Sequence, residues 1–345
     1  MIGTEKMTDG QDELGSKAVL IAGQRLLLRP LRSGEQSDAR ALLSLHRAVF
    51  GSTVDLDWFD WKYRLGQSIG FGLWRDNELI AHCGGVPRRF WRYEKSLSCL
   101  QIGDVMVDPK WRGSLARKNP FALVSNAVYS NMLGATRPYQ LGFGFPNERH
   151  MRLAAKTGLL WRVGAMKQLC WSTTEDVMTL GLGWRLRTLS KLDGTAFRTA
   201  WQAMCKEADL KNICIGERDW QYVLWRYMTR PDKQYRFVGL QRRWSTRVSG
   251  ILVLSSGDMS QWMDWIGPSD LMPLACSAAK LIASGAGSKQ LTAWCSPLVV
   301  ECLKNTGIKS SETVAAIGVP VTSDLQPDQA HEFPWWFMGG DTDFL

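Results

Sequence analysis

Three side chains that can accept a proton lie within one stretch of the sequence, residues 103–163. Asp104 stands near its start, and Glu148 and His150 follow Asn147. A carboxylate or an unprotonated imidazole can take a proton from a nucleophile, so each of the three is a candidate general base. Each also has a structural interpretation: Asp104 can cap a bulge, Glu148 suits a helix N-terminus, and His150 can be a surface histidine.

A basic turn in the same stretch can bind an anion. Its residues are Arg112, Gly113, Ser114, Leu115, Ala116 and Arg117. The turn leads toward a predicted helix, and the unpaired N–H groups and positive dipole end of a helix N-terminus favour an anion. The two arginines can add charge-assisted hydrogen bonds. A solvated basic loop is the structural alternative.

The spacing of apolar residues predicts the elements that must position these side chains. Before the basic turn we expect a strand, two helices and an antiparallel meander of three strands, at 25–31, 35–50, 55–65, 71–75, 79–91 and 97–107. After it we expect helix, strand, helix and strand, at 121–133, 139–145, 148–157 and 159–171. This order predicts an α/β fold (α+β mixed sheet), a twisted sheet flanked by helices.

A weaker copy of the pattern follows at an offset of roughly 150 to 162 residues, which indicates an internal duplication. For example, Asp219-Trp220 echoes Asp57-Trp58. We therefore expect a flexible N-terminus (1–22), a first unit (23–171), a helical connector (172–215, with helices at 184–192 and 195–208), a degenerate second unit (216–320) and an aromatic tail that packs back (321–345).

The chemistry-bearing stretch carries a motif that resembles the GNAT superfamily of acyl-CoA N-acyltransferases. The motif reads Val-x-Val-x-Pro-x-Trp-Arg-Gly from Val105 to Gly113, and the strand ending in Asn147 and a helix closing at Gly158 follow it. The resemblance covers about residues 25–171 as one unit. With the second copy, the chain resembles a tandem-repeat member of the superfamily.

The resemblance implies acetyl-CoA or another acyl-CoA as co-substrate. In that fold the strand ending at Val107 splays from its neighbour and exposes backbone groups to the pantetheine amides, and the turn after it holds the pyrophosphate. The implied cofactor-binding residues are Val105, Met106, Val107, Arg112, Gly113, Ser114, Leu115, Ala116, Arg117 and Asn147. The sequence departs from the family at Leu115, in a glycine position, and at Ala154, in the position of a tyrosine that often serves as general acid. Tyr129 or Tyr139 can substitute for that tyrosine.

The composition favours a globular protein with an anionic partner. The 345 residues contain 42 Lys and Arg against 33 Asp and Glu, a net charge of +9. The four histidines show no metal-ligand spacing, so no metal is expected. Scattered cysteines, an N-terminus without signal-peptide character and the lack of a long apolar run predict a cytoplasmic protein without a membrane span, either a monomer or a homodimer.

A candidate binding site for an anionic or sugar acceptor is the basic and aromatic cluster of Arg88, Arg89 and Trp91. The alternative is that these residues are solvated charges on an edge strand. We expect an N-acyltransferase that moves an acyl group from CoA to an amine of a small molecule or an amino-sugar or glycan precursor, by direct attack on the thioester. Two alternatives remain: a Fem-like aminoacyl-tRNA-dependent transferase, which alone would need a nucleic acid, and a non-catalytic tandem binding module.

Overall fold

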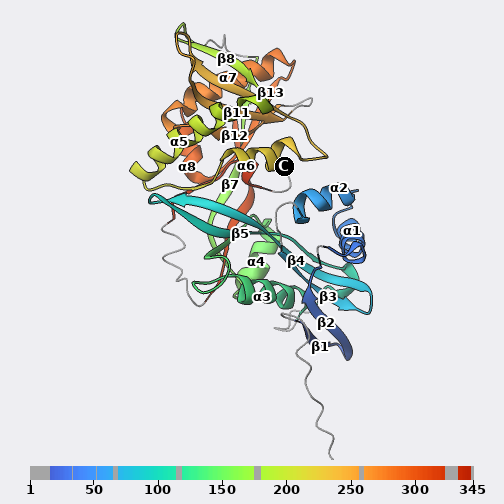
Figure 1. Ribbon diagram of the computed structural model, residues 1–345. Coiled ribbons are helices and arrows are strands. Elements are labelled where there is room, and N and C mark those ends of the chain that lie inside the picture. The colour runs from blue at the N-terminus through green and yellow to red at the C-terminus, as the bar shows by residue number, and fades with distance from the viewer. Residues whose placement is uncertain are drawn as a thin grey trace, which may run out of the picture.

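The computed structural model describes residues 16–32, 34–51, 53–64, 69–113, 119–174, 180–255, 260–322 and 333–342. Two lobes are stacked, one built mainly from the N-terminal half and the other mainly from the C-terminal half (Figure 1). One mixed sheet runs through both, in the strand order β1-β2-β3-β4-β5-β6-β14-β7-β13-β12-β11-β10-β8. None of the described helices combines the length and the apolar character that crossing a membrane requires.

The first half follows the predicted order of elements. Its strands are β1 (Lys17–Ile21), β2 (Gln24–Pro30), β3 (Ile69–Arg75), β4 (Glu78–Arg92), β5 (Lys95–Val107), β6 (Leu141–Gly144) and β7 (Leu160–Ser172). Its helices and helical turns are α1 (Gln36–Phe50), α2 (Leu56–Phe59), η1 (Asp60–Arg64), η2 (Pro109–Trp111), α3 (Pro120–Met132) and α4 (Glu148–Lys156). The mixed α/β fold is confirmed, and the second expected helix is divided into α2 and the π-helical turn η1.

The segment expected to be flexible at the N-terminus contains a strand. Residues 17–21 form β1, which pairs antiparallel with β2. Ala22 and Gly23 connect the two strands with φ values of 49° and 78°, the left-handed values that a two-residue hairpin turn needs. Most β1 side chains are exposed, so the strand lacks the buried alternation by which sequence reasoning recognises strands. The expectation for 1–22 is corrected accordingly for these residues.

Helices cover both faces of the first-half sheet. α3 and α4 pack their apolar side chains against one face, where Phe121, Val124 and Met151 join the core formed with β2 to β5. α1 and α2 pack on the other face together with Trp74 and Met106. The strands that carry the candidate site are therefore fixed from both sides.

The parallel pairing of β5 with β6 is short, and its end creates an opening in the sheet. The register runs from Cys99↔Leu141 to Ile102↔Gly144 and stops there, while β5 continues to Val107. The two strands thus diverge at the position where the sequence motif predicts a splay. This divergence exposes the backbone of one strand edge inside the sheet.

The second half repeats the first. Its strands are β8 (Trp184–Leu189), β9 (Cys214–Gly216), β10 (Tyr235–Arg242), β11 (Val248–Ser255), β12 (Ser260–Ile266), β13 (Gln290–Cys295), β14 (Ser310–Pro320) and β15 (Trp335–Trp336). Its helices and helical turns are η3 (Lys191–Asp193), α5 (Gly194–Leu210), α6 (Trp220–Val223), η4 (Leu224–Met228), η5 (Ser269–Leu271), α7 (Met272–Gly285), α8 (Pro297–Leu303) and η6 (Gly339–Asp341). The series β2-α1-α2-η1-β3-β4-β5 recurs as β8-α5-α6-η4-β10-β11-β12, which bears out the duplication.

The segment expected to be a helical connector is part of this second copy. The helix expected at 184–192 is wrong, because residues 184–189 form strand β8, which pairs with β10. Trp184 and Leu186 pack against the core while Arg185 and Arg187 are exposed, an alternation of period two. Exposed arginines at these positions also suit the polar face of an amphipathic helix, which is why the sequence pattern favours a helix here.

The two halves exchange their last strands. β14, which ends the second copy, pairs with β6 and β7 of the first half, and β7 in turn pairs with β13 of the second. The central order β6-β14-β7-β13 is therefore symmetric with respect to the two copies. Because each half lacks its own last strand, the two units are interlocked within one sheet.

The aromatic C-terminal tail lies in the seam between the halves. Trp335–Met338 are buried, β15 pairs parallel with β9, and Met338 forms a bridge with Cys295. Trp335 and Phe337 stack on each other and pack against Phe143 of β6. The tail thus contributes core to both lobes.

Candidate functional site

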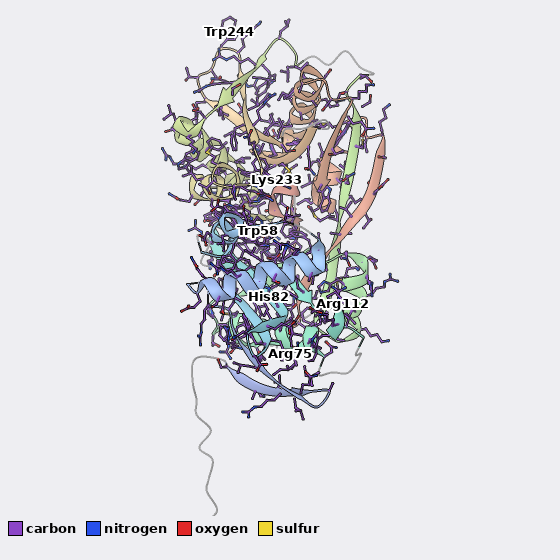
Figure 2. All side chains as sticks on the ribbon, turned by 90° about the vertical axis from the view of Figure 1, so that its right-hand side faces the viewer. Trp58, Arg75, His82, Arg112, Lys233 and Trp244 are labelled. Atoms are coloured by element: carbon purple, nitrogen blue, oxygen red, sulfur yellow. The ribbon has the colours of Figure 1, made fainter. Side chains whose placement is uncertain are left out.

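A pocket of about 400 Å³ opens where β5 and β6 diverge, and both halves contribute to it. From the splay come Ile102, Gly103, Asp104, Val105, Gly144, Phe145 and Pro146. From the helices of the first half come His46, Phe50, Trp58, Lys62, Tyr129 and His150. The second half adds Arg230, Asp232 and Lys233. Figure 2 shows Trp58 between Lys233 above and His82 below.

A β-bulge places Asp104 at the pocket. β5 has one residue more than β4 between the pairs His82↔Met106 and Gly84↔Gly103. Asp104 lies in this bulge and has a φ of 48°, which is uncommon for a residue other than glycine. A bulge turns side chains away from the regular alternation, so the sheet itself determines the direction of this carboxylate.

The Asp104 carboxylate is buried and has two donors from η1. Its Oδ2 lies 2.8 Å from the Lys62 ammonium and accepts a hydrogen bond of 2.5 Å from the Tyr63 hydroxyl. The Lys62 and Asp104 side chains are only 3% and 8% exposed. Burial alone would raise the pKa of Asp104, but the Lys62 charge and these hydrogen bonds hold it below its usual value. Asp104 is therefore ionised at neutral pH.

His82 supports the bulge from the neighbouring strand. Its Nδ1 lies 2.9 Å from the Asp104 carbonyl oxygen, so this nitrogen carries the hydrogen and donates it. The ring is fully buried, and burial lowers the pKa of His82 to about 4. Its Nε2 has no hydrogen-bond partner among the described residues. The neutral imidazole thus fixes the backbone of Asp104 without adding charge to the site.

His150 enters the pocket from the first turn of α4. Asn147 caps this helix by accepting a hydrogen bond of 2.9 Å from the His150 backbone N–H. The imidazole packs edge-on against Phe121 at 4.9 Å, and burial lowers its pKa to about 4. His150 is therefore neutral at pH 7 and can accept a proton. Glu148 is outside the pocket lining, exposed and 2.6 Å from Arg162.

Tyr129, on α3, is the tyrosine at the pocket. Ala154, which stands where a tyrosine was expected, is buried in the core and is not a lining residue. Tyr139 packs against the core at the other end of β6 and does not line the pocket. Burial raises the pKa of Tyr129 well above its usual value, so its hydroxyl keeps its proton. Of the two tyrosines proposed as substitutes, Tyr129 is the one in position.

The basic turn follows β5 directly. The Arg112 guanidinium donates through Nε to the Val107 carbonyl oxygen at 2.9 Å, and Gly113 adopts φ 110°, a value that favours glycine. Asn119 caps α3 by accepting a hydrogen bond of 2.8 Å from the Ala122 N–H. The N-terminus of α3 thus lies a few residues after Gly113, and a helix N-terminus favours an anion. Ser114, Leu115, Ala116 and Arg117 lie outside the described residues.

The predicted acceptor-binding cluster lies at the junction of the halves, apart from the pocket. Arg88 is buried and donates to the Asp341 carboxylate of the tail at 3.0 Å. Arg89 and Trp91 likewise bond to carboxylates of the second half. None of the three lines the pocket. Their bonds to carboxylates show instead that they join the two repeats.

Sequence reasoning missed the pocket residues that come from outside the motif. Trp58 belongs to α2 and Lys62 to η1, and Arg230 and Lys233 lie in the loop between η4 and β10. The sequence did contain one indication of these residues, because the second half contains a sequence similar to the α2 region. Trp61 and Trp225 stack at 5.6 Å, and each indole N–H donates to the other's carbonyl oxygen, at 2.7 and 3.0 Å. This reciprocal contact brings the second-half loop to the pocket.

The second half keeps part of the same site. Tyr227 of η4 donates to the Asp264 carboxylate of β12 at 2.9 Å, as Tyr63 does to Asp104. Asp264 also stands at a bulge, because β12 has an extra residue opposite β11. The buried Arg218 guanidinium pairs with Asp264 at 2.9 Å, in the role that Lys62 has in the first half.

The C-terminal tail fills this second site. Its Asp341 carboxylate lies 2.5 Å from Arg218, and its Gly340 carbonyl accepts hydrogen bonds from Tyr222 and Arg226. A Cβ atom at Gly340 would clash with the Tyr227 hydroxyl, so only glycine fits there. The space that is an open pocket in the first half is thus occupied by the chain's own backbone in the second.

Sequence and structural comparisons agree with this geometry. Residues 30–126 match the family described as "Acetyltransferase (GNAT) domain". No curated protein matches the chain in sequence. A probable N-acyltransferase of unknown function from Enterococcus faecalis V583 has a similar structure, with a TM-score of 0.65 and 11% identity over 85% of this chain and 72% of the other.

Two further structures show the same fold. The GCN5-related N-acetyltransferase from Kribbella flavida gives a TM-score of 0.59 with 13% identity, covering 84% of this chain and 70% of its own. N-myristoyltransferase from Saccharomyces cerevisiae with bound myristoyl-CoA gives 0.55 with 9% identity, covering 90% and 87%. The fold is that of GNAT acyltransferases, and the first half of the chain carries a match to their acetyltransferase domain.

Proposed function

We propose that the protein transfers an acyl group from acyl-CoA to the amine of a small molecule bound in the pocket. The observation that carries this proposal is that both edges of the β5–β6 splay line the same pocket as Asp104 and His150. The splay offers backbone hydrogen-bonding groups to an extended, amide-containing chain. The carboxylate and the imidazole offer the groups that proton transfer from an amine needs.

The residues around the splay fit acyl-CoA. Gly103 and Val105 on one side and Gly144 on the other line the opening, where the pantetheine amides would find backbone partners. Arg112 and the N-terminus of α3 would hold the pyrophosphate. When bound, the thioester supplies an activated carbonyl, and the Val105 backbone N–H in the bulge is suited to polarise it.

Three side chains divide the proton chemistry in this proposal. The ionised Asp104 attracts and orients the acceptor's amine. The neutral His150 accepts the amine's proton on a ring nitrogen. Tyr129, which keeps its proton, donates a hydrogen bond to the leaving sulfur. Glu148 is given no role, because it is exposed and engaged with Arg162.

The acceptor fits a small molecule better than a macromolecule, since the pocket volume lies in the range of small-ligand sites. Amino sugars and other glycan precursors are among the acceptors to be tested, because Phe50 and Trp58 form an aromatic wall against which a ring can stack.

The test is a thermal-shift series with acetyl-CoA and longer acyl-CoA esters. We expect a rise in the melting temperature with at least one ester. The rise should be lost in Arg112→Glu and kept in Arg137→Glu, which makes the same charge change at an exposed site after α3. No rise with any CoA ester would refute the proposal.

A further inference from the structure

The side of the pocket formed by the second half carries its own charged groups. The loop between η4 and β10 places Arg230, Asp232 and Lys233 in the lining. The Arg230 guanidinium also lies 5.0 Å from the ring of Trp61, which is stacked on Trp225. The loop is therefore held against the first half by packed aromatic groups.

Most charges around the pocket are paired with one another. Arg230 makes a two-point contact with Asp232, at 2.8 Å and 3.2 Å, and Lys62 pairs with Asp104. Lys233 is half-buried, and the part of the chain that the structure describes offers its ammonium no salt-bridge partner. A cation in this position is poorly solvated, and a bound anion would compensate it.

The surroundings of Lys233 favour the loss of its proton. Burial and the neighbouring Arg230 lower the pKa of Lys233 to about 8. His150 is neutral, so it does not add to the positive charge of the pocket at pH 7. Lys233 is thus still largely protonated there and ready for an anionic ligand.

The pocket has two poles. Asp104 attracts a positively charged or hydrogen-bond-donating amine at the splay, and Lys233 attracts an anion on the side that the second half contributes. Figure 2 shows Trp58 between Lys233 and His82. Arg112, which belongs to the expected pyrophosphate turn, is not among the lining residues. The Lys233 side is therefore separate from the region that would hold the CoA phosphates.

We infer that the acceptor is an amine that also carries an anionic group, a carboxylate or a phosphate, and that Lys233 binds this group. The second copy then selects the acceptor while the first copy carries the chemistry. The inference rests on the proposed N-acyltransferase function, and it explains why a copy whose own site is filled by the tail still contributes to the active pocket.

The experiment compares matched acceptors with acetyl-CoA as donor. Amino acids are paired with their amides, and amino-sugar phosphates with the free amino sugars, so the arms distinguish a carboxylate from a phosphate. We expect kcat/KM to favour the anionic member of at least one pair by about tenfold or more. In Lys233→Met the KM for that acceptor should rise about 10- to 100-fold, the effect of losing one charge-assisted hydrogen bond.

Matched measurements separate this role from a structural one. The KM for acetyl-CoA should not change in Lys233→Met, the rise in KM should be much larger for the anionic than for the neutral acceptor, and Lys233→Arg should keep the anionic preference. Lys304→Met, the same change at an exposed residue of the turn after α8, should match the wild type. Equal use of anionic and neutral amines, or equal loss with both in Lys233→Met, would overturn the inference. Absence of any acylated amine together with no CoA-induced thermal shift would instead overturn the proposed function.

Discussion

Replacing Lys62 by Met should destabilise the protein because it leaves the Asp104 carboxylate buried without its cation. The two side chains are 2.8 Å apart and almost completely buried. Removing one partner of a buried ion pair costs about 3–5 kcal/mol. The methionine keeps most of the apolar contact of the lysine stem, so the change isolates the charge.

The pH dependence of this loss gives a sharper test. In the wild type the pKa of Asp104 lies below its usual value, so its contribution is present above pH 4 and is lost only as the pH falls through the folded pKa. In the variant, burial without the cation raises that pKa, and the carboxyl can escape the penalty by protonation. Protonating a carboxyl of ordinary pKa costs about 4.2 kcal/mol at pH 7 and about 1.5 kcal/mol at pH 5. Protonation therefore limits the penalty of the unpaired carboxylate to about 4 kcal/mol at pH 7 and about 1.5 kcal/mol at pH 5, so the loss of stability should be clearly smaller at pH 5.

The assay is urea unfolding followed by tryptophan fluorescence, at both pH values, for wild type and Lys62→Met. Lys304→Met is the control, because its pair with Glu301 is exposed, and it should unfold like the wild type at either pH. A loss below about 1 kcal/mol at pH 7, or the same loss at both pH values, would show that the Lys62 charge does not hold Asp104 in place.

Three further predictions concern the tail, the proposed base and the acceptor pole. Asp341→Asn should lower the free energy of unfolding by about 3–5 kcal/mol, because the buried Arg218 loses one of its two carboxylates; an unchanged urea midpoint would contradict the assigned role of the tail. His150→Gln should lower kcat at least tenfold with little change in melting temperature, and in the wild type kcat should fall as the pH drops through about 4, where the imidazole becomes protonated; full activity of the variant would exclude His150 as the base. The KM for an anionic acceptor should rise as the pH increases above about 8, where Lys233 loses its proton, and a KM independent of pH between 6.5 and 9.5 would contradict binding by its ammonium.

Local sequence patterns were sufficient for the elements of the first half. The meander β3-β4-β5, the helices α3 and α4 and strand β7 all follow from apolar spacing and turn residues, because the pattern that marks each element lies within its own short segment. Strands β1 and β8 were missed for a related reason. β1 buries little, and the exposed arginines of β8 alternate in a way that also suits a helix.

The candidate site was predictable only in part. Asp104 and His150 lie in the chemistry-bearing stretch 103–163, and both line the pocket. Lys62 and Lys233 could not be assigned to it, because their proximity depends on how η1 and the η4–β10 loop pack across the seam. Arg88 shows the opposite case: an arginine beside aromatic residues suggests a binding surface, but its partner Asp341 is 253 residues away in the chain.

The sequence by itself predicted the mixed α/β fold and its repeated architecture, since these depend on the order of short, locally encoded elements. The tertiary structure alone decided how the copies divide their work. Exchange of β7 and β14 joins the halves in one sheet, and the tail fills the second site while the first remains open. These outcomes depend on pairing between strands and side chains more than a hundred residues apart, for which the patterns along the chain carry no local signal.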